Sequence, residues 1–372
     1  MRILFDHQVF SWQTYGGISR YVVEQMRGLQ ALGQDVMLPQ HFFSENVYLR
    51  HLSGFERHSL SRFAFKGKKW LQLQWGKSQS TQAIRAVRPD VFHPTYFDPY
   101  FLQAVHKQHI PWVITVHDMI HELYDHGSKG LFSLDARVKE HKRLLASRAN
   151  AVIVVSENTK KDLLHFCPEV DPGKVHVVHH GNHLTATSGS KPHSAAPYLL
   201  FVGQRKGYKH FLWMLEQLEP LLKEFTEMQL VCVGGGQFDD PEQASIDALG
   251  LRSRVHYRLV QSDEALAGIY QGAFCFIFPS LYEGFGMPVL EAMACGCPVV
   301  LQQGSSLPEV GGDAALYFQA TEPGSLAIAI WQLLGDEQLR QNMIKKGMDR
   351  ARMFTWEKSV QAHLHIYQSI CA

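Results

Sequence analysis

Residues 281–300, LYEGFGMPVLEAMACGCPVV, combine a glycine-containing turn with a helix and a strand. Pro288 suits the first turn of a helix, because its fixed φ matches the helix and its missing N–H is not needed there. Apolar residues then recur on one face as far as Gly296, which ends the helix, and residues 297–302 begin a strand. This order predicts an α/β fold in which helices cover a parallel sheet.

The same alternation extends over most of the 372 residues. The apolar runs are short and rich in β-branched residues, whereas the segments between them have helical periodicity. The expected strands are residues 2–5, 35–39, 90–94, 112–118, 151–156, 175–181, 198–203, 229–235, 255–260, 274–280 and 297–302. The expected helices include the one from residue 18 to Gly33, those near 77–88 and 135–148, and 157–165 after a Ser156 cap.

The length predicts two domains, because it exceeds what one hydrophobic core usually organises. Residues 184–197, LTATSGSKPHSAAP, are small and polar without an apolar period, as in a linker. We expect Rossmann-like domains at 1–185 and 186–354, with an amphipathic helix at about 355–372. Because open parallel sheets bind ligands beyond the carboxyl ends of their strands, a cleft between the two domains is expected.

Composition limits the classes of function. Lys and Arg total 36 against 35 Asp and Glu, so net charge gives no argument for nucleic acid. The six cysteines are scattered without a C-x-x-C pair, as expected for reduced thiols of a cytosolic protein. MRILFDHQVF is too short and polar for a signal peptide, and no apolar run approaches the roughly 18 residues of a membrane span. We expect a cytoplasmic protein, with peripheral binding at the inner face of the cell membrane left open.

Glu283 and Glu291 lie eight positions apart around the turn. Gly284 and Gly286 leave room for a ligand near the backbone, and the N–H groups of the following helix can cradle a diphosphate. Glu283 can then accept hydrogen bonds from sugar hydroxyls, and Glu291 from those of a ribose. Alternatively, both acids merely complement the helix dipole, at roughly 0.3–1 kcal/mol each. Geometry alone leaves both interpretations open.

Basic residues follow the expected strand at 198–203. GQRKGYK places Arg205, Lys206 and Lys209 beside Gly203. Arginine can bind a diphosphate through two parallel hydrogen bonds and lysine as a point charge. A run of basic residues is also common on a solvated surface, so this pattern does not by itself establish a phosphate site.

His117 ends an expected strand, at the end of the sheet where ligands bind. One histidine among 21 is more often structural, so both interpretations stay open. Asp118 and His93 are second-rank candidates. Gly16 and Gly17 open a helix after the first strand, either as a plain turn or as a second anion-facing helix N-terminus.

EGFGMPVLEAMACGCPVV resembles the E-x7-E signature of family-4 retaining glycosyltransferases. Other family motifs are similar to YGGISRY, TVHD, VSENTKKDL, LLFVGQRKGYKHF, LPEVGGDAALYF and FTWEKSVQAHLHIY. The resemblance covers nearly the whole chain and is weakest in 40–90 and 122–140. It implies the GT-B fold, in which two Rossmann-like domains face each other across the active site. Residues 1–185 would form the domain on the acceptor side, and residues 186–354 the domain that binds the nucleotide-sugar donor. It further implies that the C-terminal helix packs back onto the first domain.

The resemblance also implies site residues. Its catalytic residues would be His117, Glu283, Arg205 and Lys209. Arg205 and Lys209 would hold the diphosphate, and His117 would contact a sugar hydroxyl without acting as a general base. The donor-binding residues would be Gly16, Gly17, Gly203, Arg205, Lys209, Val260, Glu283, Gly284, Phe285, Gly286, Met287 and Glu291, with backbone groups near Val260 reading the base.

The implied reaction transfers a hexose to a glycan or a lipid-linked acceptor, as in bacterial O-antigen and capsule assembly. GDP-mannose and UDP-glucose are the two candidate donors. The sequence contains no D-x-D pair, so we expect neither a metal nor another cofactor. Residues 57–77 mix basic and aromatic residues, which suits an acidic membrane interface or a lipid-diphosphate acceptor, although a solvated helix explains the pattern as well.

Other functions remain to be weighed. VCVGGGQFDD suggests an NAD-dependent oxidoreductase, but it lacks the full G-x-G-x-x-G spacing and a following acidic residue for the ribose. A non-catalytic sugar-nucleotide-binding protein or a sugar-nucleotide epimerase could share the scaffold, because fold does not fix function.

Overall fold

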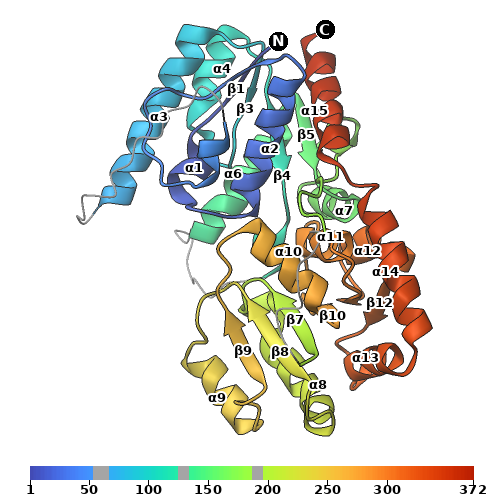
Figure 1. The fold of residues 1–372 in the computed structure, drawn as a ribbon. Helices are drawn as coiled ribbons and strands as arrows, with labels where there is room; N and C mark the ends of the chain where they lie inside the picture. Colours follow the sequence, from blue (N-terminus) through green and yellow to red (C-terminus); the bar gives the residue numbers. More distant parts are fainter. Residues whose placement is uncertain (53–66, 125–133, 187–195) are drawn as a thin grey trace. The chain divides into compact units, whose positions relative to one another are not determined.

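The structure, a computed structural model, describes residues 1–52, 67–124, 134–186 and 196–372. The chain forms two compact units, unit 1 (Met1–Gly181 with Trp356–Ala372) and unit 2 (Asn182–Thr355). Each unit is a parallel sheet with helices, as the α/β prediction requires (Figure 1). Most of the expected linker and the first part of segment 57–77 lie outside the described residues.

The sheet of unit 1 is built from two parallel ladders. Their strand orders are β2-β1-β3 and β4-β5-β6, and a parallel bridge between Phe92 and Trp112 connects β3 to β4. The strands are β1 (Arg2–Phe5), β2 (Asp35–Met37), β3 (Val91–His93), β4 (Val113–Val116), β5 (Ala151–Val154) and β6 (Val175–Val177). Because β2 and β3 flank β1 on opposite sides, the strand order reverses at β1 and creates a topological switch point.

Eight α-helices accompany the described strands of unit 1. They are α1 (Gln8–Trp12), α2 (Gly17–Ala31), α3 (Lys68–Val87), α4 (Leu102–Gln108), α5 (Ile120–Leu123), α6 (Leu134–Arg148), α7 (Glu157–Phe166) and α15 (Trp356–Cys371). The Ser156 cap is confirmed, because its side chain accepts a hydrogen bond from the Thr159 N–H. Helix α3 begins at Lys68 and not near residue 77. The sequence predicts a shorter helix because Gln72, Gly76 and Ser80, on the buried face, give no apolar period.

The C-terminal helix α15 packs against α2 within unit 1 (Figure 1). Val360, Ile366 and Tyr367 belong to the same buried core as the apolar face of α2. At the crossing, a Cβ on Gly28 would lie 2.3 Å from Val360 Cγ2, so only glycine permits this approach. This C-terminal helix, which is sixteen residues long, is therefore part of the core of the first unit.

Unit 2 contains a six-stranded parallel sheet of order β12-β11-β10-β7-β8-β9. The strands are β7 (Tyr198–Val202), β8 (Gln229–Val233), β9 (Val255–Arg258), β10 (Cys275–Phe278), β11 (Val299–Gln302) and β12 (Ala315–Phe318). From β7 the chain proceeds outward to β9 and then returns to β10 on the other side, which is the doubly wound Rossmann order. The switch point of unit 2 therefore lies between β7 and β10.

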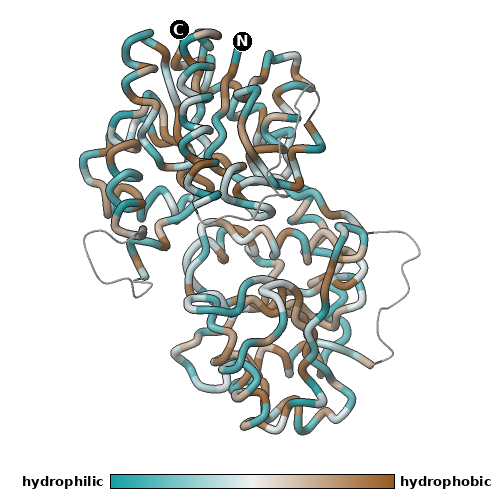
Figure 2. Tube along the Cα trace, turned by 90° about the vertical axis from the view of Figure 1, so that its left-hand side faces the viewer, coloured by the Kyte–Doolittle hydropathy of each residue, from teal (hydrophilic) through white to brown (hydrophobic). Residues whose placement is uncertain are grey.

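Helices cover the sheet of unit 2. They are α8 (Phe211–Glu224), α9 (Asp240–Ala248), α10 (Asp263–Gly272), α11 (Met287–Ala294), α12 (Leu307–Gly311), α13 (Ser325–Gly335) and α14 (Glu337–Ala351). Pro288 stands in the first turn of α11 as predicted, and Gly296 follows the helix at φ +73°. Hydrophobic stretches run through the interior of each unit, and hydrophilic residues are frequent on the outer helices (Figure 2).

All six cysteines are free, as predicted. Five of them are buried, whereas Cys371 is exposed. Among the described residues, no helix combines the length and the apolar character needed to cross a membrane.

Candidate functional site

Lys209 and Glu283 form an ion pair at the switch point of unit 2. Lys209 follows β7 and Glu283 follows β10, the two adjacent strands from which the chain winds in opposite directions. Lys209 Nζ lies 2.5 Å from Glu283 Oε1, and the side chains are 14% and 12% exposed. The Leu281 N–H donates to the Tyr208 carbonyl at 2.8 Å and connects the two loops. These charges therefore lie where an open parallel sheet binds ligands.

Two serines brace the turn that starts at Glu283. Ser305 Oγ accepts a hydrogen bond from the Glu283 N–H at 3.0 Å. Ser306 Oγ lies 2.9 Å from the carbonyl oxygens of Glu283 and Phe285, which share its one O–H donor. Gly286 adopts φ +105°, a conformation that favours glycine. These contacts fix the backbone that leads into α11, so the positive end of that helix has a defined position.

Glu291 is a buried carboxylate on α11. It is 8% exposed, and its Oε2 accepts a hydrogen bond from the Tyr270 hydroxyl at 3.1 Å. Its Oε1 lies 3.8 Å from His183 Nε2. Burial, and then the neighbouring carboxylate, raise the pKa of Tyr270 well above its ordinary value, so the phenol stays protonated as the donor. A carboxylate accepts several hydrogen bonds, so Glu291 can also bind the hydroxyls of a ligand.

Arg205 is buried and makes its contacts within the protein. Its side chain is 2% exposed, and its Nη2 lies 3.1 Å from Glu242 Oε2. Further N–H groups donate to the carbonyl oxygens of Gly234 (2.6 Å), Gly236 (2.8 Å) and Gln237 (2.9 Å). Most of its five donors are therefore used inside the protein. Arg205 fastens the loop after β7 to the loop after β8, and its part in holding a diphosphate stays a prediction.

The other residues predicted to bind a donor in unit 2 occupy separate positions. Gly203 follows β7 with φ +141°, and Val260 is partly exposed in the loop after β9. Gly284 is buried in the braced turn, and Met287 opens α11. Phe285 is 4% exposed, and its ring lies 5.8 Å from that of Phe354 within unit 2.

In unit 1, His117 follows β4 and packs against α2. Its ring lies edge-on to Tyr21 with centroids 4.8 Å apart, and it stacks with His180 at 5.9 Å. These rings remove water from the imidazole and lower the pKa of His117 to about 4. At neutral pH the ring is therefore uncharged, with one N–H donor and one acceptor nitrogen, which suits a hydrogen bond to a hydroxyl.

The C-terminal helix reaches Tyr21 through His363. His363 Nδ1 lies 2.7 Å from the Ser359 carbonyl, which can only accept, so Nδ1 carries the proton. His363 Nε2 then accepts from the Tyr21 hydroxyl at 2.6 Å. The Tyr21 oxygen accepts in turn from the Thr115 hydroxyl at 3.0 Å. The ring that packs on His117 is thus held at its hydroxyl by β4 and α15.

His93 completes this network and does not act as a ligand residue. Its Nε2 donates to Thr115 Oγ1 at 3.0 Å, and its Nδ1 accepts from the Tyr367 hydroxyl at 2.7 Å. Both ring nitrogens are bonded within the protein, and the side chain is buried. This imidazole therefore connects β3 and β4 to α15.

Gly16 and Gly17 precede and open α2. A Cβ on Gly16 would lie 2.7 Å from Gln13 Oε1, which accepts a hydrogen bond from the Ser19 N–H at 3.1 Å. No atom lies within 4 Å of a Cβ on Gly17. The shape of this loop therefore depends more on Gly16 than on Gly17. Asp118 stabilises its own turn, because its Oδ1 accepts from the Ile120 N–H at 3.1 Å.

Several partners of the predicted residues were not anticipated. Tyr270 and His183 contact Glu291 from distant positions, and the sequence holds no local signal for either contact. Glu242 had a signal, because Asp239 and Glu242 form a capping box that places Glu242 in the first turn of α9. Among the residues that the structure describes, no group of three or more His, Cys, Asp or Glu is placed to hold a metal ion.

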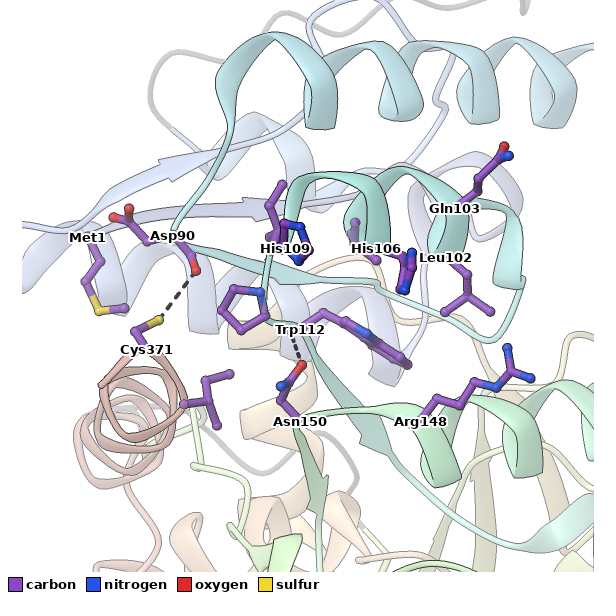
Figure 3. Close-up of a pocket in the computed structure, with 14 residues that line it drawn as sticks. Met1, Asp90, Leu102, Gln103, His106, His109, Trp112, Arg148, Asn150 and Cys371 are labelled. Atoms are coloured by element: carbon purple, nitrogen blue, oxygen red, sulfur yellow. Dashed lines mark hydrogen bonds between the residues drawn. The ribbon is translucent and has the colours of Figure 1, made fainter.

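A groove of about 1080 Å³ lies at the other end of the unit 1 sheet (Figure 3). Asp90, Trp112 and Asn150 line it and precede β3, β4 and β5. The Asn150 side chain accepts from the Trp112 N–H at 3.1 Å, so it supports the backbone here. Since His117 lies at the opposite, carboxyl end of the strands, we do not assign this groove to the candidate site.

Two family models match the chain. "Glycosyltransferase Family 4" matches residues 15–185, and "Glycosyl transferases group 1" matches residues 188–350. O-antigen chain mannosyltransferase B of Escherichia coli is 33% identical over 174 residues, which are 46% of this chain and 45% of that protein. D-inositol 3-phosphate glycosyltransferase of Corynebacterium jeikeium is 27% identical over 286 residues, 70% of this chain and 67% of that protein. The match with the first relative therefore spans less than half of its length.

Solved structures share the fold. Sucrose-phosphate synthase from Thermosynechococcus elongatus is 19% identical with a TM-score of 0.79, over 99% of this chain and 98% of that chain. HepE of Anabaena, in complex with UDP and glucose, is 16% identical with a TM-score of 0.77, over 99% of each chain. These likenesses show the GT-B fold with two Rossmann-like domains. Since the two family models together cover nearly all of residues 15–350, the chain belongs to the family-4, group 1 glycosyltransferases.

Proposed function

We propose that this protein is a retaining glycosyltransferase. It moves a hexose from a nucleotide diphosphate sugar to a glycan or a lipid-linked saccharide during the synthesis of cell-surface polysaccharide. The observation that carries the proposal is the Lys209–Glu283 ion pair at the switch point of unit 2, eight residues before the buried Glu291. In this proposal Glu283 binds the hexose, Lys209 and the α11 N-terminus bind the diphosphate, and Glu291 binds the ribose.

Lys209 is the proposed cation for the departing diphosphate. Its ammonium neutralises Glu283 at 2.5 Å. An ammonium has three donors, so it can keep one hydrogen bond to the carboxylate and give another to a phosphate oxygen. The charge of the leaving group grows as the sugar departs, and fixed charges at this point are usually the largest catalytic term.

In the proposed reaction, the bond between hexose C1 and the β-phosphate oxygen breaks while a bond from C1 to an acceptor oxygen forms on the same face. The leaving phosphate takes the proton of the acceptor hydroxyl, so no protein base is required. His117 is uncharged at neutral pH and supplies a hydrogen bond to a hexose hydroxyl. Tyr21 fixes the plane in which that imidazole lies.

GDP-mannose and UDP-glucose are the proposed donors. One named relative is a mannosyltransferase, and one structural neighbour holds UDP and glucose. A thermal-shift panel of nucleotide sugars would identify the donor, because a ligand at 100 times its Kd adds about 2.7 kcal/mol of stability. For a domain of this size that is a rise in Tm of roughly 5–11 °C. A panel without any such rise would contradict the proposal.

Release of the nucleoside diphosphate tests the activity itself. The wild-type protein should release GDP or UDP slowly without an acceptor and faster with one. The anomeric configuration of the product, read by NMR, should equal that of the donor. We also propose that no metal takes part, so chelator should leave the rate unchanged. A rate that falls in chelator and returns with Mn²⁺ would refute this part.

Two alternative functions predict other outcomes. A non-catalytic binding protein would show the thermal shift without any nucleoside diphosphate release. The oxidoreductase alternative depends on the glycine run 234–236, which follows β8. Carbonyl groups of this run accept hydrogen bonds from Arg205. A dinucleotide-binding fingerprint belongs after the first strand of such a sheet, which here is β7.

We further propose that α3 touches an anionic membrane surface. Trp70, Leu71 and Trp75 are 65%, 43% and 45% exposed, and Lys69 is exposed beside them. Exposed aromatic and basic side chains on one helix suit the headgroup region of a bilayer. The protein should co-sediment with vesicles that contain phosphatidylglycerol, and Trp70→Ser should weaken this. Trp331→Ser in unit 2 is the matched control, and equal loss in both variants would refute the role of α3.

A further inference from the structure

Lys142 is a buried lysine on α6. Its side chain is 1% exposed, and its Nζ lies 2.8 Å from Oε2 of Glu122, whose side chain is 9% exposed. The ammonium also lies 5.5 Å from the centroid of the Phe97 ring. Removing two charges from water is costly, and apolar residues of similar volume often stabilise a core as well. The position of this ion pair in the fold is therefore more informative than its effect on stability.

The ammonium of Lys142 closes the turn that follows β4. It donates to the Asp118 carbonyl at 3.0 Å and lies 3.9 Å from Met119 Sδ. Its third contact is the carboxylate of Glu122 on α5. An ammonium has three N–H donors, so these three contacts engage all of them inside unit 1. Lys142 is thus placed to hold the backbone of the turn and not to bind a ligand.

The position of His117 depends on this turn, because His117 is the residue between β4 and Asp118. Its ring packs on the rings of Tyr21 and His180. Within the part of the chain that the structure describes, no hydrogen bond holds the ring nitrogens of His117. Ring packing limits the tilt of the imidazole, whereas the backbone sets how far it reaches beyond the end of the sheet. The bond from Lys142 to the next residue therefore fixes the reach of His117.

Lys142 also acts on His117 through its charge. Burial is the main cause of the lowered pKa of His117, which Asp118 opposes, whereas His363 and Lys142 lower that pKa further. Other titratable groups near the ring are Tyr21 of α2, His93 of β3 and His180 after β6. Loss of the ammonium should therefore raise the pKa of His117.

We propose that Lys142 is a positioning residue for the transfer reaction, holding the turn so that the His117 imidazole meets a hydroxyl of the hexose. Glu122 balances the buried charge. This inference rests on the proposed function, in which His117 binds the hexose. An ion pair that only stabilised the fold would make both partners equally important. A positioning role makes them unequal, because Lys142 alone of the two donates a side-chain hydrogen bond to the Asp118 carbonyl.

The first experiment compares turnover in variants of the full chain. Lys142→Met combined with Glu122→Gln removes both charges together, so no charge is left unpaired in the interior. In this double variant kcat should fall about tenfold, as for loss of one well-placed hydrogen bond, with the Kd for GDP or UDP unchanged. Glu122→Gln alone should keep most of kcat, and Arg137→Met, at an exposed position of α6, is the matched control. Wild-type turnover by the double variant would overturn the inference.

A double-mutant cycle tests whether Lys142 acts through His117. His117→Phe keeps a ring against Tyr21 but removes both nitrogens. In this background the combined change at Lys142 and Glu122 should cause no further loss of kcat, because residues that act as a unit are not additive. The same fold loss in both backgrounds would show that the pair acts independently of His117, and would overturn the positioning role.

A third measurement needs no donor. In NMR spectra of the full chain with ¹³C-labelled histidine, the His117 signal is identified by its loss in His117→Phe. The combined Lys142 and Glu122 variant should move this signal and raise the pH at which it titrates, whereas Arg137→Met should not. An unchanged His117 signal would overturn the inference. If the wild-type protein releases no nucleoside diphosphate from any donor, the proposed function fails, and the coupling of Lys142 to His117 is judged by this signal alone.

Discussion

Acid should unfold unit 1 before unit 2, because unit 1 buries several histidines in the neutral form. Burial lowers the pKa of His7 and of His363 to about 4, from an ordinary value of 6.5. Burial also lowers the pKa of His93, His117 and His180. In the unfolded chain these rings take up protons as the pH falls through 6.5, whereas in the folded unit they do so only near pH 4. Their contribution to stability is therefore present above pH 6.5 and is lost towards pH 4.

The size of this effect follows from proton linkage. A histidine with these two pKa values reduces the free energy of unfolding by about 2 kcal/mol between about pH 7 and about pH 5. His7 and His363 together give about 4 kcal/mol, which is a large part of the roughly 5–15 kcal/mol that stabilises a domain. Burial lowers the pKa of His210 in unit 2 as well, but that ring is partly exposed, so unit 2 should lose less.

Urea unfolding at several pH values measures the loss. Pulse-labelling hydrogen exchange, with the label always applied at one pH, assigns each transition to unit 1 or unit 2. His363→Gln removes one of the titrating rings. Between about pH 7 and about pH 5, the free energy of unfolding of unit 1 should therefore fall by about 2 kcal/mol less in this variant than in the wild type. The slope with pH is the readout, because the variant also loses hydrogen bonds and is less stable at every pH.

His106→Gln is the matched control, because His106 is an exposed residue of the same unit. Its pH slope should equal that of the wild type. The reasoning is refuted if unit 1 is equally stable at both ends of the pH range, if unit 2 unfolds first, or if His363→Gln keeps the full slope.

Three further changes test the assigned contacts. Lys209→Met should lower the rate of nucleoside diphosphate release about 10²–10³-fold, as for loss of one fixed transition-state charge, and Lys209→Arg should restore part of it. Arg205→Gln should destabilise unit 2 by about 3–5 kcal/mol in urea, since it leaves a buried carboxylate unpaired, whereas Lys206→Gln at an exposed position should change little. Tyr21→Phe should destabilise unit 1 by about 2–4 kcal/mol, because a buried imidazole and a buried hydroxyl lose their partner, and Tyr15→Phe is its exposed control. If neither Arg205→Gln nor Tyr21→Phe unfolds more easily than its control variant, these contacts do not stabilise the protein.

Most strands could be predicted because the composition of each short segment already favours a buried strand. A buried parallel strand reads as a short continuous apolar run, as in CFIF of β10, and such runs stand out between polar segments. β12 was missed, because ALYF is a short edge strand with two of its four residues only partly buried. Helix α3 was predicted too short for the opposite reason, since its buried face carries polar and small side chains.

The candidate site was only partly predictable. Lys209 and Glu283 follow strands that proved to be neighbours at the switch point, so position along the chain was informative. The pairing of Glu291 with Tyr270 joins residues on two helices, and it depends on how α10 packs against α11. Local sequence patterns do not encode such contacts, because the facing residues are chosen by tertiary packing.

Arg205 and Lys209 show that charge and position along the chain do not determine the surroundings of a side chain. Both follow β7 within one short loop, yet one guanidinium is enclosed by a carboxylate and three carbonyl groups while the ammonium retains 14% exposure. The difference arises from Glu242, which α9 places beside the loop. A buried guanidinium with a matched carboxylate is fixed in place, because separating them would leave a charge unpaired in the interior. Arg205 therefore positions the loop, and the fixed loop in turn determines where the Lys209 ammonium lies.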